Sequence, residues 1–162
     1  MEKKNKIYQS FNMETKNVSD ENREIEACAS YEKLDRDGDI VYLDGLDITN
    51  FKKNQGPILW SHDSYSPPLA KVTKVWVDGK KLMMRMKFAE MEEYGFADTI
   101  YKLVKGGYIN NLSIGFKPNW DEATFNEKNK GWEFKKSELL ETSIVNVPAN
   151  SNARIITRSL DR

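Results

Sequence analysis

Residues 69–88 have the sequence LAKVTKVWVDGKKLMMRMKF, and this stretch decides the fold class. Two runs rich in apolar residues, 69–77 and 80–88, flank the dipeptide Asp78-Gly79. Such a dipeptide between alternating runs is the strongest short-range signal for a β-hairpin. The apolar face of the second run carries Leu82, Met84, Met86 and Phe88. We therefore predict an antiparallel hairpin with one buried face.

Further strands are predicted on both sides of this hairpin. Apolar or alternating runs lie at residues 23–31, 40–43, 57–60, 108–117, 132–136 and 139–147. Residues 47–51 fit one capped helical turn, and residues 90–105 show the apolar spacing of a helix that Gly106-Gly107 would end. Residues 119–131 are polar and predict a loop or a hairpin tip. The pattern favours a mostly β protein of the α+β class, with a mostly antiparallel sheet closed into a small barrel or sandwich and peripheral helices.

The chain length and its polar ends suggest how the chain is organised. The 162 residues fit one domain that is long enough to bury a core. Residues 1–21 form a polar N-terminal arm, either flexible or a weak first strand, and residues 151–162 form a mostly polar C-terminal tail. We expect the folded domain to occupy residues 22–150.

Charge and cysteine content argue against several classes of function. Lys plus Arg and Asp plus Glu both number 25, so the zero net charge disfavours a nucleic-acid binder that relies on a basic surface. A single cysteine, Cys28, forms no internal disulfide and no cysteine-based zinc site, which favours a reducing compartment. No apolar run approaches the roughly 18–20 residues of a membrane span, and the basic start lacks the hydrophobic region of a secretory signal. These features predict a cytosolic protein.

Three polar side chains lie in otherwise apolar runs. His62 is the only histidine, and imidazole is the side chain that titrates near neutral pH. Ser113 shares a strand face with Gly115, where the missing side chain would leave room for a substrate or backbone. Glu141 lies in an apparently buried run, where a carboxylate needs a partner. Serine, histidine and carboxylate on separate strands are the parts of a nucleophilic hydrolase, although each residue also has an ordinary structural explanation.

Two other features carry less weight. Residues 35–39, Asp-Arg-Asp-Gly-Asp, resemble the start of a calcium loop, but Ile40 and Leu46 stand where an EF-hand needs a glycine and a carboxylate. A polar turn between strands explains this segment, so we expect no metal site there. Cys28 lacks a recognisable activating context for a nucleophile.

Six blocks of sequence between residues 23 and 155 together resemble a known family. They are GDIV at 38–41, LWSHD at 59–63, PLAKV at 68–72, LVKGG at 103–107, LSIGF at 112–116 and ETSIVNVPAN at 141–150. In this order and spacing they resemble the prohead proteases of tailed bacteriophages. Those proteins are capsid-maturation serine peptidases related in fold to herpesvirus assemblins.

The resemblance implies a fold and a set of roles. The protease domain, residues 22–150, would be a small closed β-barrel of the herpesvirus-protease type with peripheral helices. His62 would be the general base, Ser113 the nucleophile and Glu141 the third member, where assemblins use a second histidine that this chain lacks. Asp63 is the first alternative to Glu141, but neighbouring residues on a strand point to opposite faces. The resemblance implies no cofactor and no metal.

The resemblance also implies partners and a place of action. The substrates would be the phage major capsid protein with its scaffold segment, and the protease itself, cut inside the assembling procapsid in the bacterial host cytoplasm. We expect neither nucleic acid nor a membrane among the partners, and a homo-oligomer is compatible with the resemblance. The alternatives are an inactive relative that acts as a capsid-assembly or scaffold component, and a generic β-barrel binding module. We favour the enzyme because all three candidate positions carry competent side chains.

Overall fold

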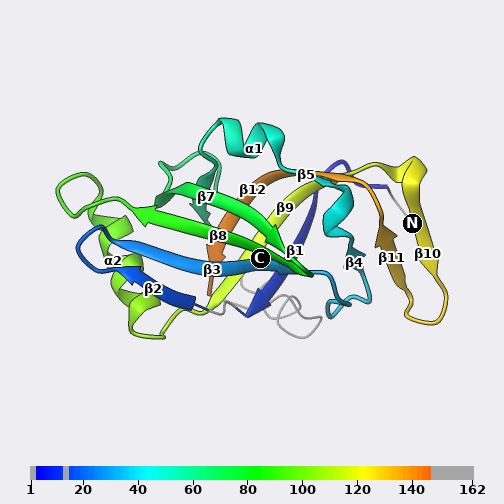
Figure 1. Ribbon diagram of the computed structural model, residues 1–162, viewed down its shortest axis with the longest axis horizontal. Helices are drawn as coiled ribbons and strands as arrows, with labels where there is room; N and C mark the ends of the chain where they lie inside the picture. Colours follow the sequence, from blue (N-terminus) through cyan, green and yellow to red (C-terminus); the bar gives the residue numbers. More distant parts are fainter. Residues whose placement is uncertain (1–2, 13–14, 147–162) are drawn as a thin grey trace, which may run out of the picture.

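The computed structural model describes residues 3–12 and 15–146, and these residues form two sheets and two α-helices. The larger sheet has nine strands: β1 (Ile7–Asn12), β2 (Thr15–Ser19), β3 (Glu24–Tyr31), β5 (Leu46–Asp47), β6 (Pro57–Trp60), β7 (Ala70–Asp78), β8 (Lys81–Phe88), β9 (Asn111–Pro118) and β12 (Ser137–Val145). Their order is β1-β9-β12-β6-β7-β8-β3-β2, with β5 added beside β12. Figure 1 shows β7, β8 and β3 running across the curled sheet, with β12, β9 and β1 on its other side.

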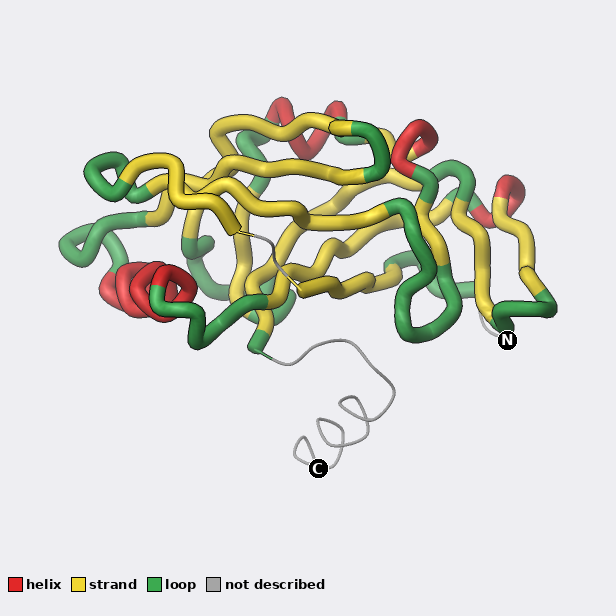
Figure 2. Tube along the Cα trace, turned by 60° about the horizontal axis from the view of Figure 1, so that its bottom comes forward, coloured by secondary structure: helices red, strands yellow, loops and turns green. Residues whose placement is uncertain are grey.

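The smaller sheet and the helices lie at the periphery. Strands β4 (Ile40–Val41), β10 (Ala123–Asn126) and β11 (Gly131–Phe134) form the three-stranded sheet, in the order β10-β11-β4. Helices α1 (Thr49–Lys53) and α2 (Gly95–Lys105) lie outside the strands (Figure 2). Two 3₁₀ turns, η1 (Leu43–Gly45) and η2 (Trp120–Glu122), complete the elements in the described part of the chain. None of the helices described is long and apolar enough to cross a membrane.

The predicted hairpin is confirmed, with its turn displaced by one residue. Strands β7 and β8 are antiparallel, and Asp78 pairs with Lys81, so the two-residue loop is Gly79-Lys80. Gly79 has a φ angle of 59°, and a type II′ turn uses glycine at this first loop position. The predicted apolar face of β8 is buried, with each of its four side chains at most 1% exposed: Leu82, Met84, Met86 and Phe88.

The predicted mostly β fold is confirmed, and most strand pairs of the larger sheet are antiparallel as predicted, but the predicted closed barrel is wrong. The sheet curls into an open half-barrel, because its end strands β1 and β2 do not pair with each other. Side chains bridge part of the gap instead: Ser30 Oγ donates a hydrogen bond to Gln9 Oε1 at 3.0 Å. The exceptions to antiparallel pairing in this sheet are at β12, which runs parallel to β5 and β6 and antiparallel to β9. Alternation along a strand identifies its buried face, but it does not specify the neighbouring strand or its direction.

Other predicted elements differ at their ends. Helix α2 begins at Gly95 rather than at residue 90, because Tyr94 is extended and residues 91–93 form a turn closed by a 2.8 Å bond from Tyr94 N–H to Glu90 O. Within the predicted loop at 119–131 lie η2 and β10, and β10 pairs with β11. The predicted N-terminal arm contributes β1 and β2 to the larger sheet. The C-terminal tail at 151–162 lies outside the described residues.

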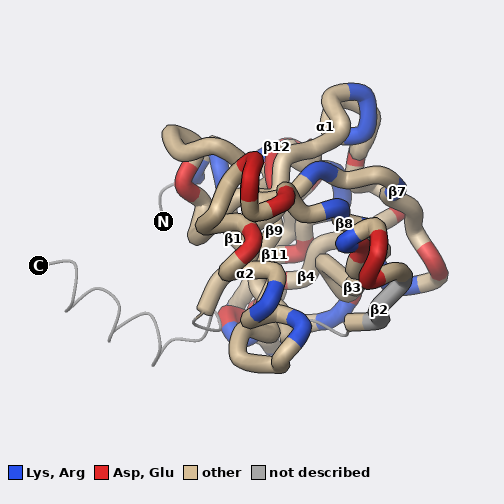
Figure 3. Tube along the Cα trace, turned by 90° about the vertical axis from the view of Figure 1, so that its left-hand side faces the viewer, with Lys and Arg blue, Asp and Glu red and all other residues tan. Residues whose placement is uncertain are grey.

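Acidic and basic residues are interspersed along the chain. On the side shown in Figure 3, segments of both charges occur around helix α2 and the nearby loops. This distribution fits the zero net charge of the sequence.

Candidate active site

The turn after β6 places His62 over the sheet. Strand β6 ends at Trp60, and the next two residues, Ser61 and His62, have φ angles of 49° and 62°. This left-handed conformation costs residues with a Cβ roughly 1–2 kcal/mol each, and such strain concentrates at functional sites. Two hydrogen bonds to β12 hold the turn: Ser61 N–H donates to Ile144 O at 2.9 Å, and His62 N–H donates to Ser143 Oγ at 2.9 Å.

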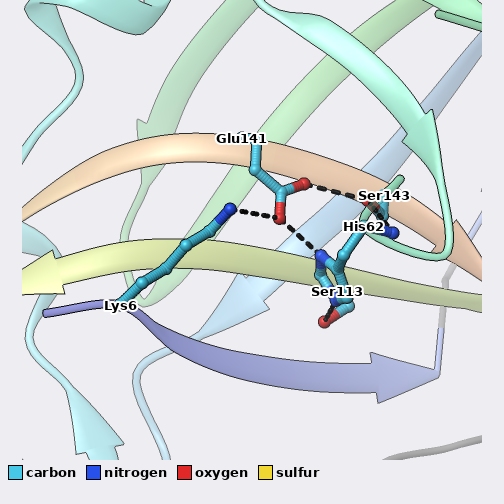
Figure 4. Close-up of polar contacts among 5 residues, drawn as sticks. All are labelled: Lys6, His62, Ser113, Glu141 and Ser143. Atoms are coloured by element: carbon cyan, nitrogen blue, oxygen red, sulfur yellow. Dashed lines mark hydrogen bonds and ion pairs between the residues drawn. The ribbon is translucent and has the colours of Figure 1, made fainter. Parts of the chain in front are cut away.

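The imidazole of His62 lies between Ser113 and Glu141 (Figure 4). Its Nε2 atom is 2.8 Å from Ser113 Oγ, and its Nδ1 atom is 2.5 Å from Glu141 Oε1. Because a carboxylate oxygen only accepts, Nδ1 carries the proton and Nε2 accepts from the serine hydroxyl. Ser113 and Glu141 are buried, and the His62 side chain is 18% exposed. The fold therefore brings together all three residues that the sequence singled out.

Gly115 has a different neighbour from the one expected from the sequence. It lies directly opposite Glu141 in the pairing of β9 with β12. A Cβ atom at this position would lie 2.5 Å from Glu141 Oε1 and 2.8 Å from Lys6 Cε. The missing side chain thus makes room for the Glu141 carboxylate and for Lys6, rather than for a substrate.

Two further side chains contact the Glu141 carboxylate. Ser143 Oγ donates to Glu141 Oε2 at 2.9 Å, and Lys6 Nζ lies 3.5 Å from Glu141 Oε1. The side chain of Lys6 is 35% exposed, whereas that of Glu141 is 6% exposed. With His62, these contacts satisfy both carboxylate oxygens, as a buried charge requires.

Strand β1 lies along the other side of the nucleophile strand. Ser10 is directly opposite Ser113, and Tyr8 is opposite Gly115. The ring of Tyr8 packs against the imidazole of His62, with 3.9 Å between ring centroids. Tyr8 is itself 45% exposed. The N-terminal strand therefore forms one wall of the site.

Asp63, the alternative third member, is engaged in its own turn. Its Oδ1 atom accepts from the amide of Tyr65 at 2.9 Å, and its Oδ2 atom accepts from Ser66 Oγ at 2.6 Å. The Ser66 hydroxyl and the Tyr65 amide lower the pKa of Asp63 below its ordinary value. These contacts leave Glu141 as the carboxylate that contacts the imidazole.

The acidic segment at residues 35–39 forms a polar turn. Asp35 Oδ1 accepts from the amides of Asp37 at 2.8 Å and Asp39 at 2.9 Å, and Asp39 Oδ1 accepts from the amide of Trp132 at 2.8 Å. Oxygen atoms of the three carboxylates lie within 4.8 Å of one another. Burial raises the pKa of Asp35, and the hydrogen bonds to its carboxylate oppose that effect. This hydrogen bonding accounts for the cluster as a structural turn.

Cys28, a weak candidate nucleophile, is buried in β3. Its Sγ atom donates to Ser30 O at 3.3 Å. The thiol is fully shielded from solvent, whereas reactive cysteines are at least partly exposed.

The sequence did not lead us to predict a role for Ser143, Lys6 or Tyr8. Ser143 had a usable signal, because residues two apart on a strand share a face and Ser143 follows Glu141 by two. Tyr8 lies in β1 and pairs with Gly115, about one hundred residues later in the chain, and Lys6 directly precedes that strand. No local pattern marks a contact of that kind.

The comparisons with known proteins point to one family. The family model described as caudovirus prohead serine protease matches residues 10–162. The capsid polyprotein of Pseudomonas phage PAJU2 is 32% identical, over 99% of this chain and 23% of its own length. The prohead protease of Escherichia phage T5 is 29% identical over 85% of this chain and 66% of its own length. A probable capsid maturation protease of Lactococcus phage p2 is 30% identical over 68% of this chain and 58% of its own length.

The fold has a solved counterpart. The bacteriophage T4 capsid assembly protease matches with a TM-score of 0.66 and 12% identity, over 88% of this chain and 98% of that chain. At this identity the likeness shows the fold alone. The chain spans between 23% and 66% of the length of the curated relatives described above. Because the family model covers nearly the whole sequence, the chain belongs to the caudovirus prohead serine protease family.

Proposed function

We propose that this chain is a serine endopeptidase with Ser113 as nucleophile, His62 as general base and Glu141 as the residue that orients the base. One observation carries the proposal: an unbroken line of contacts runs from Ser113 Oγ through the imidazole to the Glu141 carboxylate, at 2.8 Å and 2.5 Å. Membership of a serine protease family supports the same assignment.

The proposed mechanism follows from the roles of the atoms. Ser113 Oγ attacks the peptide carbonyl carbon while its proton passes to His62 Nε2. The imidazolium then gives this proton to the leaving amine, and the acyl-enzyme remains. Water then attacks the acyl carbon while Nε2 takes its proton, the ester bond to Ser113 Oγ breaks, and Nε2 returns the proton to Oγ as the acid product leaves. Glu141 accepts the Nδ1 proton in a hydrogen bond throughout, which fixes the tautomer and stabilises the imidazolium.

The proposed substrates are phage capsid or scaffold protein, together with the protease itself, and the proposed place of action is the assembling procapsid. This part rests on relatives described as a prohead protease, a probable capsid maturation protease and a capsid polyprotein. Ser113 is buried, and the Tyr8 ring packs on His62. Side chains around Ser113, including Tyr8, must therefore shift before a peptide carbonyl reaches Oγ.

Removal of the nucleophile tests the proposal. We expect a fluorophosphonate, which forms a phosphorus–oxygen bond with an activated serine and releases fluoride, to label the purified chain at Ser113. Ser113→Ala and His62→Ala should abolish labelling and cleavage of the coexpressed capsid protein of the same phage. Ser137→Ala, which changes another buried serine of the sheet, should keep both. Labelling of a different residue, or cleavage that survives in Ser113→Ala, would remove Ser113 from the mechanism.

A pair of neutralising substitutions tests the third member. Glu141→Gln should lower the labelling rate by about 10²- to 10⁴-fold, because an amide in place of the carboxylate favours the wrong imidazole tautomer. Asp63→Asn should leave the rate within a few-fold of the wild type, since that carboxylate serves its own turn. The rates are measured by quenched-time-course mass spectrometry. The reverse ranking would reassign the role to Asp63.

A further inference from the structure

We infer that Ser143 is a positioning residue for the proposed serine peptidase, because its hydroxyl holds the Glu141 carboxylate and the main chain of His62 at the same time. The inference rests on the proposed function and adds a fourth side chain to it. Ser143 touches neither reacting atom, so it acts through the residues that it holds.

The Ser143 hydroxyl donates one hydrogen bond and accepts another. The hydroxyl has one hydrogen atom, and through it Oγ donates a hydrogen bond to Glu141 Oε2 at 2.9 Å. The same oxygen accepts the main-chain N–H of His62 at 2.9 Å. One atom therefore sets the distance between the carboxylate and the backbone that carries the imidazole (Figure 4).

The position of Ser143 in the sheet makes this link rigid. On β12 it lies directly opposite Ser113 of β9, and on the other side it pairs with Leu59 of β6. These three strands carry or directly precede Ser113, Glu141 and His62. Ser143 is also 0% exposed, so water does not compete for its hydroxyl.

The conformation of the His62 turn explains why such a link is needed. Ser61 and His62 are consecutive residues with positive φ angles, and neither is a glycine. Two main-chain amides fasten the turn to β12, one through Ile144 O and one through Ser143 Oγ. Without the serine hydroxyl, the amide of His62 itself would lose its acceptor, while the neighbouring attachment would remain.

A second serine of β12 provides a control that distinguishes a positioning role from the general effect of changing a buried serine. Ser137 is buried, with 7% exposure, and its Oγ atom has no hydrogen-bond partner in the described part of the chain. Ser137→Ala therefore makes the same chemical change in the same strand without breaking a link to the site. It is the matched control for Ser143→Ala.

The single histidine makes the consequence directly observable. In protein labelled with ¹⁵N-histidine, every imidazole signal in the NMR spectrum belongs to His62. We expect the wild type and Ser137→Ala to show one tautomer, with the proton on Nδ1. Ser143→Ala should show mixed tautomers or a broadened Nδ1–H signal, and fluorophosphonate labelling of Ser113 should slow by about 10- to 100-fold, the range expected for a small misplacement of a catalytic group.

Two more variants keep the test decisive if the alanine variant folds poorly. Ser143→Cys preserves the shape but donates only weakly, so it should show the same changes as alanine. Ser143→Thr keeps the hydroxyl and should regain most of the labelling rate. Wild-type histidine spectra and labelling rates in Ser143→Ala or Ser143→Cys would overturn the inference. If the wild type is not labelled while Ser143→Ala still alters the tautomer, the proposed function fails and the positioning role stands.

Discussion

Gly115 shows how a residue without a side chain contributes to the site. It pairs with Glu141 across β9 and β12, and the space beside its Cα holds the Glu141 carboxylate and the end of Lys6. Lys6 is flexible and partly exposed, so it has room to move aside. The buried carboxylate is held by His62 and Ser143, and it has no equivalent freedom.

Gly115→Ala should therefore impair the site while preserving the fold. The new methyl group would displace Glu141 Oε1, which lies 2.5 Å from the position of the added atom. A displacement of about 1 Å in a catalytic group lowers rates by up to ~10²-fold, so we expect a 10- to 100-fold slower labelling of Ser113. Gly95→Ala is the control, because no atom lies within 4 Å of its added Cβ. Equal labelling rates in both variants would contradict this account of Gly115.

At the scale of elements, helix α2 is attached to the sheet through Arg23 and Asp98. Arg23 Nη2 lies 2.7 Å from Asp98 Oδ1 and donates to Ala89 O at 3.0 Å, and its guanidinium stacks over the Tyr101 ring at 4.3 Å. Within the helix, Lys102 Nζ lies 2.9 Å from Asp98 Oδ2, one turn away. Asp98 is thus a charged residue on the buried face of a helix, with a cation on each oxygen.

This arrangement predicts how stability depends on pH. The hydrogen bond from Lys102, followed by that from Arg23, lowers the pKa of Asp98 below its ordinary value of 3.8. A carboxyl group whose pKa is lower in the folded state stabilises the fold fully above the unfolded-state value, and this contribution is lost as the pH falls through the folded-state value. Asp98→Asn should therefore lower the melting temperature at pH 7, and the difference from the wild type should shrink as the pH falls below about 3.8.

Thermal denaturation followed by circular dichroism measures this difference. Glu92→Gln is the control, since Glu92 is an exposed acid in the turn before α2. Its difference from the wild type should stay small at all pH values. A difference for Asp98→Asn that is the same at pH 7 and pH 3 would show that charge on Asp98 does not stabilise the fold.

At the scale of the whole molecule, the opening of the half-barrel is bridged by side chains. Gln9 of β1 is 1% exposed, its Oε1 accepts from Ser30 Oγ at 3.0 Å, and its Nε2 donates to Asp35 Oδ2 at 3.3 Å. Nearby, the rings of Phe11 and Tyr31 meet edge to face at 5.2 Å. These contacts fasten β1, which carries Tyr8 to the site and directly follows Lys6, to the opposite side of the curled sheet.

Gln9→Ala should loosen this connection. It removes the acceptor of a fully buried hydroxyl, which costs about 1–3 kcal/mol of unfolding free energy. The double variant Gln9→Leu with Ser30→Ala removes both polar partners and should recover part of that loss. Urea denaturation measures the stability, and hydrogen exchange should show faster exchange of the β1 amides in Gln9→Ala. Unchanged exchange in β1 would mean that pairing with β9 alone holds the strand.

The amino-acid sequence by itself determined the local elements and the chemical parts of the site. Alternation identified β8 and its buried face, and the apolar runs around His62, Ser113 and Glu141 drew attention to those three polar residues. Both inferences depend on side-chain type and short spacing, which are local properties. The same properties suggested a hairpin turn correct to within one residue.

Tertiary structure alone decided the pairing of distant strands. It left the barrel open, ran β6 parallel to β12, placed Lys6 on the Glu141 carboxylate, and brought the main-chain N–H of His62 to Ser143 Oγ. It also gave the space beside Gly115 to that carboxylate. The physical reason is that strand order, direction and register depend on which backbone edges meet after the chain folds. No local sequence pattern specifies which strands, far apart in the sequence, will pair with each other.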